Sequence, residues 1–473
     1  MKHVTRIAFV LLMATCTAPA FSQKTFVLCS PDEKFQSEIK ISTTDIKYNI
    51  KHDGDLMLDF SRIHMSLDKG RAFGINPKLS GTKTKTVDRI LNADIYKKKE
   101  VRDNFNELTL KFKGNYRIVF RAYNEGIAYR FESDIKGDII VENELSEFNF
   151  LHDAKAYIPY VRDNVATLES QFGNPFENIY KYENISQWDT SRIAFLPLLV
   201  EGRNGKKLCI LEADLLNYPG MYLYNGDGSN TLKSVFAPYP KEVEQGGYLN
   251  LQGLVKSREP YIAKVSGVTS FPWRIMVVSE NDKELADNDM VFKLATRPQG
   301  DFSWVKPGKA AWEWWHAWNL LGVDFKTGIN NETYKCYIDF ASRYGVEYIL
   351  LDDGWSPKNE ADLFKVVPEL DLPELVRYGK ERNVGLILWA GYYPFDRDME
   401  SVCKYYSEMG IKGFKVDYME RDDQLMVDFH HRAAEVAAKY KLLLDLHGTY
   451  KPTGLQCTYP NVVNIEGYTD WNR

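Results

Sequence analysis

The sequence has few cysteines, no long hydrophobic run after its N-terminus and no large excess of either charge. Only 6 of its 473 residues are Cys, none in Cys-x-x-Cys spacing, so neither a zinc framework nor a disulfide framework is indicated. No later segment approaches the about 18 apolar residues that a membrane-spanning helix needs, so we expect a soluble chain without a membrane span. A net charge of −5 does not indicate the positively charged surface that nucleic-acid binding requires, so we expect no nucleic-acid partner.

The composition is that of a folded protein of more than one domain. Hydrophobic residues make up 44% and charged residues 26%, which argues against disorder. At its N-terminus, Lys2 and Arg6 precede an apolar stretch, and Ala20 and Ser22 supply the small residues of a cleavage site. This pattern predicts a secretory signal peptide over residues 1–22 and an exported protein, periplasmic or secreted.

Residues 23–297 predict an N-terminal β-sandwich domain. Short segments alternate apolar and polar residues, are punctuated by Gly, Pro and Asn, and show almost no helical period. The clearest predicted strands are 108–112, 117–122, 127–131, 207–213 and 273–279.

From residue 298 to 473 strands alternate with helices, which predicts a parallel α/β domain. The apolar strand segments are 310–315, 348–351, 385–389, 413–416, 442–446 and 462–465. The main helical segments are 331–344, a helix opened by Asp371, 398–409 and 422–440. We interpret the domain as an incomplete (β/α)8 TIM barrel containing strands one to six only, and an open six-stranded parallel sheet is the alternative.

Acids, tryptophans and basic residues follow the ends of these strands, where barrel enzymes build their active sites. Carboxylates can bind sugar hydroxyls and aromatic rings can stack on a sugar face, so the set predicts a carbohydrate pocket. The alternative is that each acid only caps the next helix. The strand-end residues are Trp312, Asp352, Asp353, Trp389, Lys415, Asp417, His447 and Glu466.

Asp417 is the candidate nucleophile among them. It directly follows an apolar strand, and Lys415 lies two residues earlier on the same face. We expect this ammonium group to lower the pKa of Asp417 and keep it ionised, as a nucleophile on a glycosidic carbon requires. A salt-bridged structural aspartate is the alternative.

Several words of the sequence, considered together, resemble glycoside hydrolase family 97 over about residues 25–467. They are Phe176-Glu177-Asn178-Ile179-Tyr180, Lys306-Pro307-Gly308, Trp312-Glu313-Trp314-Trp315, Leu351-Asp352-Asp353-Gly354-Trp355, Lys415-Val416-Asp417-Tyr418-Met419, His447-Gly448 with Lys451-Pro452-Thr453-Gly454, and Thr458-Tyr459-Pro460-Asn461. The resemblance implies an exo-acting α-glycosidase with a β-super-sandwich, a catalytic barrel and a small C-terminal β-domain.

The resemblance also implies a calcium ion held by glutamates. By position these are Glu177 and Glu466, with Glu183 a competing candidate for the first. If both bind one ion, that ion joins the two domains. Calcium prefers hard oxygen ligands, and carboxylates supply them.

The branch of the family is implied by two positions. Inverting α-glucosidases of the family carry a glutamate directly after the strand-five histidine, whereas retaining α-galactosidases carry an aspartate nucleophile at the end of strand four. Here Gly448 follows His447 and Asp417 ends strand four. The chain therefore resembles the retaining branch, with α-linked oligosaccharides or galactosides as expected substrates and Asp417 as nucleophile.

The resemblance stops after Gly467. The family continues with roughly Val-Tyr-Gly-Leu-Glu, whose glutamate is the general acid/base and a further metal ligand, whereas this chain ends in Tyr-Thr-Asp-Trp-Asn-Arg. One deleted base would convert the first reading into the second, so we expect a frameshifted or truncated gene. The acid/base position then falls on Asn472, with Asp470 a conceivable substitute. Two alternatives to a retaining α-galactosidase remain: an inverting α-glucosidase and a non-catalytic carbohydrate-binding remnant.

Overall fold

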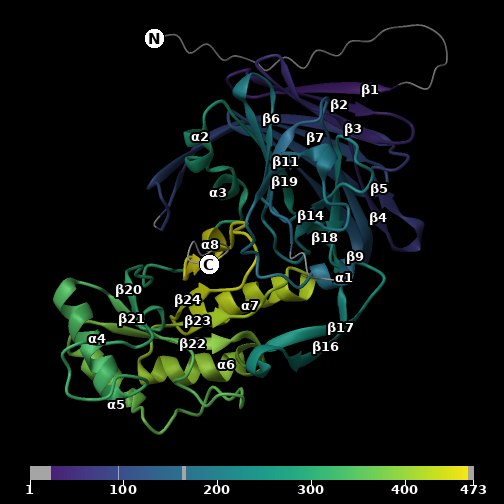
Figure 1. Cartoon of the computed structure of the whole chain (residues 1–473). Coiled ribbons are helices and arrows are strands. Elements are labelled where there is room, and N and C mark those ends of the chain that lie inside the picture. Colours follow the sequence, from purple (N-terminus) through teal and green to yellow (C-terminus); the bar gives the residue numbers. More distant parts are fainter. Residues whose placement is uncertain (1–22, 94, 162–166, 467–473) are drawn as a thin grey trace, which may run out of the picture. The chain divides into compact units, whose positions relative to one another are not determined.

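The computed structural model describes residues 23–93, 95–161 and 167–466, which form two compact units (Figure 1). The first unit contains the chain up to Gln171 together with Ile179–Pro238 and Pro260–Leu294. The second contains Phe172–Asn178, Tyr239–Glu259 and the chain from Ala295 onward. The predicted signal peptide 1–22, Asp470 and Asn472 lie outside the described residues.

The first unit is an antiparallel β-structure built from alternating sequences. In β2, for example, every second side chain is buried, which is the pattern of a strand with one face on the core. The strands are β1 Lys24–Cys29, β2 Phe35–Ile41, β3 Ile46–His52, β4 Asp55–Leu67, β5 Ala72–Phe73, β6 Leu79–Asn92, β7 Glu100–Phe112, β8 Tyr116–Tyr123, β9 Gly126–Asn149, β10 Lys155–Ile158, β11 Lys181–Asn184, β12 Leu198–Glu201, β13 Lys207–Ala213, β14 Met221–Tyr224, β15 Thr231–Phe236, β18 Ala263–Ser270 and β19 Trp273–Ser279.

The long strand β9 connects these strands into one sandwich. It pairs antiparallel with β4, β8, β15, β18 and β19. Its first residues pair with β8 and β19 and its last residues with β15, so its two ends lie in different layers. Between the layers, β19 is buried along its whole length and packs with Phe105 and Tyr123 in an apolar cluster. Short helices α1 Leu168–Gln171, α2 Asp282–Ala286 and α3 Met290–Leu294 complete this unit. The predicted β-sandwich is confirmed.

The second unit contains a six-stranded parallel sheet in which consecutive strands are neighbours. Its strands are β20 Ala310–Trp312, β21 Tyr348–Leu351, β22 Gly385–Gly391, β23 Gly413–Asp417, β24 Leu443–Leu446 and β25 Val462–Ile465. Helices α4 Asn331–Tyr344, α5 Leu372–Lys380, α6 Tyr392–Met409, α7 Gln424–Lys439 and α8 Leu455–Thr458 alternate with them (Figure 1). This order and direction are those of the first six strands of a (β/α)8 barrel, so the prediction of an incomplete barrel is confirmed.

The helix ends follow the expected capping chemistry. The side chain of Asn330 accepts a hydrogen bond from Thr333 N at the start of α4, and Gly345 ends that helix with a left-handed backbone. Asp371 and Asp423 cap α5 and α7 in the same way. These carboxylates are therefore structural.

Several predicted element boundaries differ from those of the structure, and two of them bear on the site. Helix α6 begins at Tyr392 rather than at residue 398, with Pro394 in its first turn, where a helix tolerates proline, and its backbone is kinked at Asp398, where the predicted helix begins. The first barrel strand ends at Trp312 rather than at residue 315, since Trp314–His316 form a 3-10 turn.

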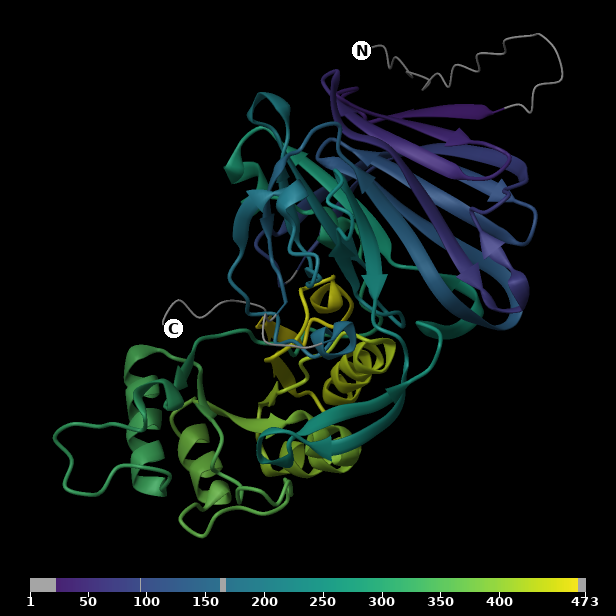
Figure 2. The same ribbon diagram turned by 45° about the vertical axis from the view of Figure 1, so that its right-hand side comes forward.

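A β-hairpin far away in sequence belongs to the second unit. Its strands are β16 Pro240–Gly246 and β17 Gln252–Arg258, and β17 lies against α6 (Figure 2). The Gly253 carbonyl accepts a hydrogen bond from Arg421 Nη1 at 2.8 Å, and Tyr393 N donates to the Leu251 carbonyl at 2.9 Å. Within the described residues, none of the helices combines the length and apolarity needed to cross a membrane.

Candidate active site

All the strand-end residues singled out in the sequence belong to the second unit. Trp312, Trp389, Lys415 and Asp417 lie at or near the carboxyl ends of their strands. The others follow the strands directly: Asp352 and Asp353 follow β21, His447 follows β24 and Glu466 follows β25. Because parallel strands place their carboxyl ends at one edge of the sheet, the side chains gather there.

Asp352, Lys415 and Trp312 form one hydrogen-bonded group. Asp352 Oδ2 accepts a hydrogen bond from Lys415 Nζ at 2.7 Å and another from Trp312 Nε1 at 2.7 Å. The Lys415 ammonium also lies 4.4 Å from the centre of the Trp312 ring, within cation–π range. The Lys415 side chain is 4% exposed and the Asp352 side chain 5%, so this ion pair is buried. Together with the hydrogen bond from Trp312, it fixes the three side chains relative to one another.

Asp417 has a different environment from Asp352. Its Oδ1 accepts from Tyr418 N at 2.7 Å and its Oδ2 from Trp389 Nε1 at 3.2 Å. Among the described residues no cationic side chain lies within ion-pair distance of it. Lys415 pairs with Asp352 instead, so the geometry does not support a salt-bridged structural role for Asp417.

The expected effect on the pKa of Asp417 is wrong in its net direction. Burial raises the pKa of Asp417, and the positive charges of Lys415 and His447 lower it by less. The sequence showed the neighbouring ammonium group but could not show how deeply the strand end is buried.

Asp353 is the next carboxyl of the same group. Burial raises its pKa, Lys358 opposes that shift, and the charges of Asp352 and Asp417 add to it. With Trp389, Lys358 and Leu251 of the hairpin it lines a hollow in the second unit. Its polar lining is mixed, with Asp362 and Asn359 beside Asp353 and Lys358, and its other walls are aromatic and aliphatic.

His447 is held between two carboxylates. Its Nε2 lies 3.0 Å from Asp445 Oδ1 and its Nδ1 lies 2.9 Å from Glu466 Oε2. Burial alone would lower the pKa of His447, but these hydrogen bonds outweigh it and raise the pKa to about 9. The ring is therefore an imidazolium at neutral pH and adds positive charge beside Asp417. Asp445 was not predicted as a site residue, although it lies only two residues before His447 in the sequence.

The two predicted calcium ligands belong to the same compact unit. Glu177 lies in the segment Phe172–Asn178, whose Asn174 N donates to the Glu420 carbonyl at 2.7 Å. Both glutamates are half-buried. Burial would raise the pKa of Glu466, but the hydrogen bond from His447 lowers it. Hard anionic oxygens of this kind fit calcium by chemistry.

Glu313 is a site residue that the sequence reasoning missed. Its Oε1 accepts hydrogen bonds from Asp352 N at 2.8 Å and from the Tyr334 hydroxyl at 2.9 Å, while its buried Oε2 has no hydrogen-bond partner. Burial raises the pKa of Glu313 to about 7. Its position directly after Trp312, the last residue of a strand, could have marked it as a candidate in the sequence. Only the structure shows that it holds the Asp352 backbone.

Gly448 packs directly against Asp417. Its φ is +58°, and a Cβ built on it would lie 3.3 Å from Tyr418 N and 3.4 Å from Asp417 Oδ1. A side chain here would therefore crowd the carboxylate. The absence of a side chain at residue 448 leaves Asp417 accessible.

These groups form a candidate carbohydrate site at one edge of the parallel sheet: a carboxylate without an ion-pair partner among the described residues, a hollow lined by Asp353 and Trp389, and two fixed basic side chains. The sequence comparisons agree with that class. The family model described as Glycosyl-hydrolase 97 N-terminal matches residues 28–297, and that described as Glycoside hydrolase 97 matches residues 312–468. The chain belongs to glycoside hydrolase family 97.

Individual relatives support the same assignment. The chain is 51% identical to the "Retaining alpha-galactosidase" of Bacteroides thetaiotaomicron over 98% of its own length and 70% of that protein. It is 26% identical to the "Probable retaining alpha-galactosidase" of Streptomyces bingchenggensis, over 95% of this chain and 67% of that one.

Solved structures show the same fold. A family 97 enzyme from Pseudoalteromonas sp. strain K8 matches 93% of this chain and 69% of its own with a TM-score of 0.80 at 22% identity. A β-arabinopyranosidase matches 92% and 68% with a TM-score of 0.75 at 22% identity.

Proposed function

We propose that the protein is an exo-acting hydrolase of terminal α-galactosides that retains anomeric configuration, with Asp417 as its nucleophile. The observation that carries this proposal is the environment of Asp417, a half-buried carboxylate held by two N–H donors and facing a residue without a side chain. The 51% identity to a protein called a retaining α-galactosidase supports the substrate class.

In the first step an Asp417 oxygen attacks the anomeric carbon while the bond from that carbon to the leaving oxygen breaks. The product is a glycosyl ester, which water then hydrolyses to free sugar and the original carboxylate. The Tyr418 and Trp389 N–H groups fix the carboxylate for attack, which is the orientation contribution to catalysis. The predicted acid/base position lies outside the described residues, so no protein group is assigned the leaving-group proton.

The other strand-end residues would bind the sugar. Asp352 is immobilised by Lys415 and Trp312, and the Lys415 ammonium has two further protons available for a sugar hydroxyl. Asp353 and Trp389 line the adjoining hollow, and the His447 imidazolium offers positive charge near the reacting centre. An export signal fits a role on extracellular or periplasmic glycans, and that localisation rests on the predicted residues 1–22 alone.

Calcium is part of the proposal through Glu177 and Glu466, which would hold the ion. Bound calcium would supply positive charge that favours ionised carboxylates and a departing oxygen. Chelation is expected to lower the melting temperature, since a ligand bound by the native state adds stability. Calorimetric melting of the wild type and Glu177→Gln, each with and without calcium, checks this: a response of equal size in both would remove Glu177 from the site.

An inverting α-glucosidase is the second candidate, and the Gly448 geometry disfavours it. That chemistry needs room for a water molecule and a carboxylate base in this part of the pocket. A glutamate at residue 448 would instead place a second negative charge against Asp417.

Asp417→Ala tests the proposal directly. With 2,4-dinitrophenyl α-galactoside, whose leaving group needs no protonation, we expect a loss of at least about 10³-fold in kcat. Added azide should partly restore turnover of the variant and yield β-galactosyl azide, because azide replaces the carboxylate from the same face. NMR of the product identifies the anomer.

The matched control is Asp339→Ala, which makes the same change at an exposed position on α4. It should keep full activity. Wild-type turnover that survives in Asp417→Ala would remove Asp417 from the mechanism. Sugar binding without any turnover in the wild type would favour the non-catalytic alternative.

A further inference from the structure

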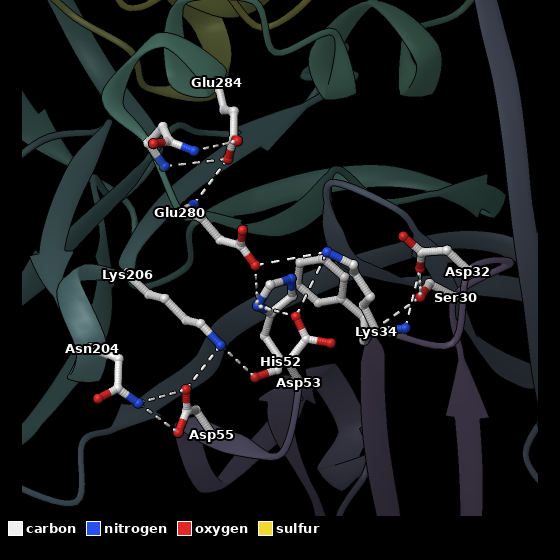
Figure 3. Close-up of polar contacts among 12 residues, drawn as sticks. Ser30, Asp32, Lys34, His52, Asp53, Asp55, Asn204, Lys206, Glu280 and Glu284 are labelled. Atoms are coloured by element: carbon white, nitrogen blue, oxygen red, sulfur yellow. Dashed lines mark hydrogen bonds and ion pairs between the residues drawn. The ribbon is translucent and has the colours of Figure 1, made fainter.

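The sandwich unit carries a second group of potential metal ligands, none of which was singled out in the sequence. His52 ends β3, Asp53 begins the turn into β4, and Glu280 follows β19 (Figure 3). One ligand atom from each side chain lies within 4.8 Å of the other two. The two strand ends therefore bring together an imidazole and two carboxylates from positions more than 200 residues apart.

His52 carries the argument because it is buried and its ring nitrogen is unpartnered. The residue is 4% exposed, and Nδ1 has no hydrogen-bond partner among the described residues. Nδ1 lies 3.9 Å from Asp53 Oδ2 and 3.9 Å from Glu280 Oε1, too far for a hydrogen bond to either. A buried polar atom without a hydrogen-bond partner is destabilising, and Nδ1 faces two carboxylates without a hydrogen bond to either.

Neighbouring side chains define the surroundings of the ring. Burial lowers the pKa of His52, and the nearby Lys206 ammonium lowers it further, against the opposing charges of Asp53 and Glu280. Lys206 is itself engaged, since its Nζ lies 2.8 Å from Asp55 Oδ2 and donates to the His52 carbonyl at 2.9 Å. Packing of Phe35 on the imidazole, with ring centroids 4.5 Å apart, fixes the ring orientation.

Lys34 is the cation that competes for the two carboxylates. Its Nζ lies 3.7 Å from Asp53 Oδ2 and 3.8 Å from Glu280 Oε1, and its side chain is 48% exposed. Neither distance is that of a hydrogen bond, and the exposed side chain can move into solvent at little cost. Lys34 cannot, however, accept a hydrogen bond from the imidazole, because an ammonium group has no acceptor atom.

We propose that His52, Asp53 and Glu280 bind one divalent transition-metal ion of the zinc class, with His52 Nδ1 and one oxygen from each carboxylate as ligands and water completing the coordination. Neighbouring ligands about 2.0–2.1 Å from a tetrahedral zinc are about 3.4 Å apart. The observed 3.9 Å needs a small inward movement, which the exposed carboxylates of Asp53 and Glu280 can make. The imidazole favours zinc over calcium, which takes oxygen ligands.

Zinc chloride titrated calorimetrically into the chelator-stripped full chain at pH 7.5 tests the site. We expect one saturable site that calcium chloride does not fill. Asp53→Asn and Glu280→Gln should each weaken zinc binding at least about tenfold. Both positions are exposed, and asparagine tolerates the φ of +48° at residue 53, so these variants should fold.

Two further variants make the result specific. Glu33→Gln removes an exposed carboxylate beside Lys34 and should leave the affinity unchanged. Lys34→Met removes the competing ammonium group and should tighten zinc binding about threefold to tenfold. Equal affinity in the wild type, Asp53→Asn and Glu280→Gln would show an adventitious ion only, and no saturable site in the wild type would equally overturn the proposal.

Discussion

A buried triad in the sandwich neutralises its two carboxylates, whereas two carboxylates of the α/β unit have no ion-pair partner among the described residues. In the sandwich, Arg274 lies between Glu144 and Glu212, and all three side chains are at most 1% exposed. In the α/β unit, Glu313 keeps a buried oxygen without a hydrogen-bond partner, and Asp417 has N–H donors but no ion pair among the described residues.

The difference separates stabilising charges from reactive ones. Arg274 Nε and Nη2 each donate to Glu144 at 2.8 Å, Nη1 bonds Glu212, and the guanidinium also lies 5.2 Å from the centre of the Phe236 ring. Every charge there has a partner, which suits a fixed core. Burial instead raises the pKa of Glu313 and of Asp417, which leaves carboxylates that can exchange protons or bond to substrate.

Arg274→Met should have the largest effect on stability. It removes the cation and leaves two carboxylates buried and unpaired, so we expect the free energy of unfolding to fall by about 3–5 kcal/mol. Urea denaturation followed by circular dichroism measures this. Arg102→Met is the matched control, because Arg102 pairs with Asp88 on the surface at 2.8 Å and such pairs contribute at most about 1 kcal/mol. Equal losses in the two variants would contradict a structural role for the buried triad.

Much of the fold was predictable because local pattern and final structure agree. Strands β13, β19, β21 and β25 and helix α4 have the bounds that the sequence predicts, since apolar runs and capping residues mark both ends. The hairpin β16–β17 and the segment Phe172–Asn178 were not predicted to group with the α/β unit. Their assignment depends on long-range contacts, which periodicity does not encode.

Glu313→Gln should remove a pH dependence that the sandwich triad does not share. The folded protein holds the Glu313 proton up to a pKa of about 7, above its ordinary 4.5. The stability associated with that proton is therefore full below about pH 4.5 and is lost as the pH rises through 7. The loss is up to about 3 kcal/mol. Urea unfolding at pH 5 and pH 8 should show this loss in the wild type and its absence in the variant.

The control for that titration is Glu374→Gln, a partly exposed carboxylate whose pKa the Lys335 hydrogen bond lowers. It should keep the wild-type difference between pH 5 and pH 8. If Glu313→Gln keeps that difference as well, the buried proton is not on Glu313.

The sequence was enough to predict that the strand-end residues gather at one edge of the sheet, but not how they interact. Placing residues after parallel strands was enough to bring Asp352, Lys415 and His447 to one edge of the sheet. Which carboxylate Lys415 pairs with depends on side-chain reach in three dimensions, and the structure gives Asp352 rather than Asp417. The roles of Asp445 and Glu313 were missed for the same reason, because each acts through a neighbour.

Gly448→Ala should have the smallest effect on stability and separates backbone strain from crowding of Asp417. The φ of +58° costs an alanine about 1–2 kcal/mol, and its Cβ would also press on Asp417 Oδ1 and Tyr418 N. Gly345→Ala is the matched control, since its φ is +66° and a Cβ there meets nothing within 4 Å. We expect similar losses in the free energy of unfolding for both variants, measured in urea, but about a tenfold fall in kcat for Gly448→Ala alone. The methyl group displaces the carboxylate from its two N–H donors, so kcat should fall more than KM changes. If both variants retain wild-type kcat, open space at residue 448 is not what keeps Asp417 reactive.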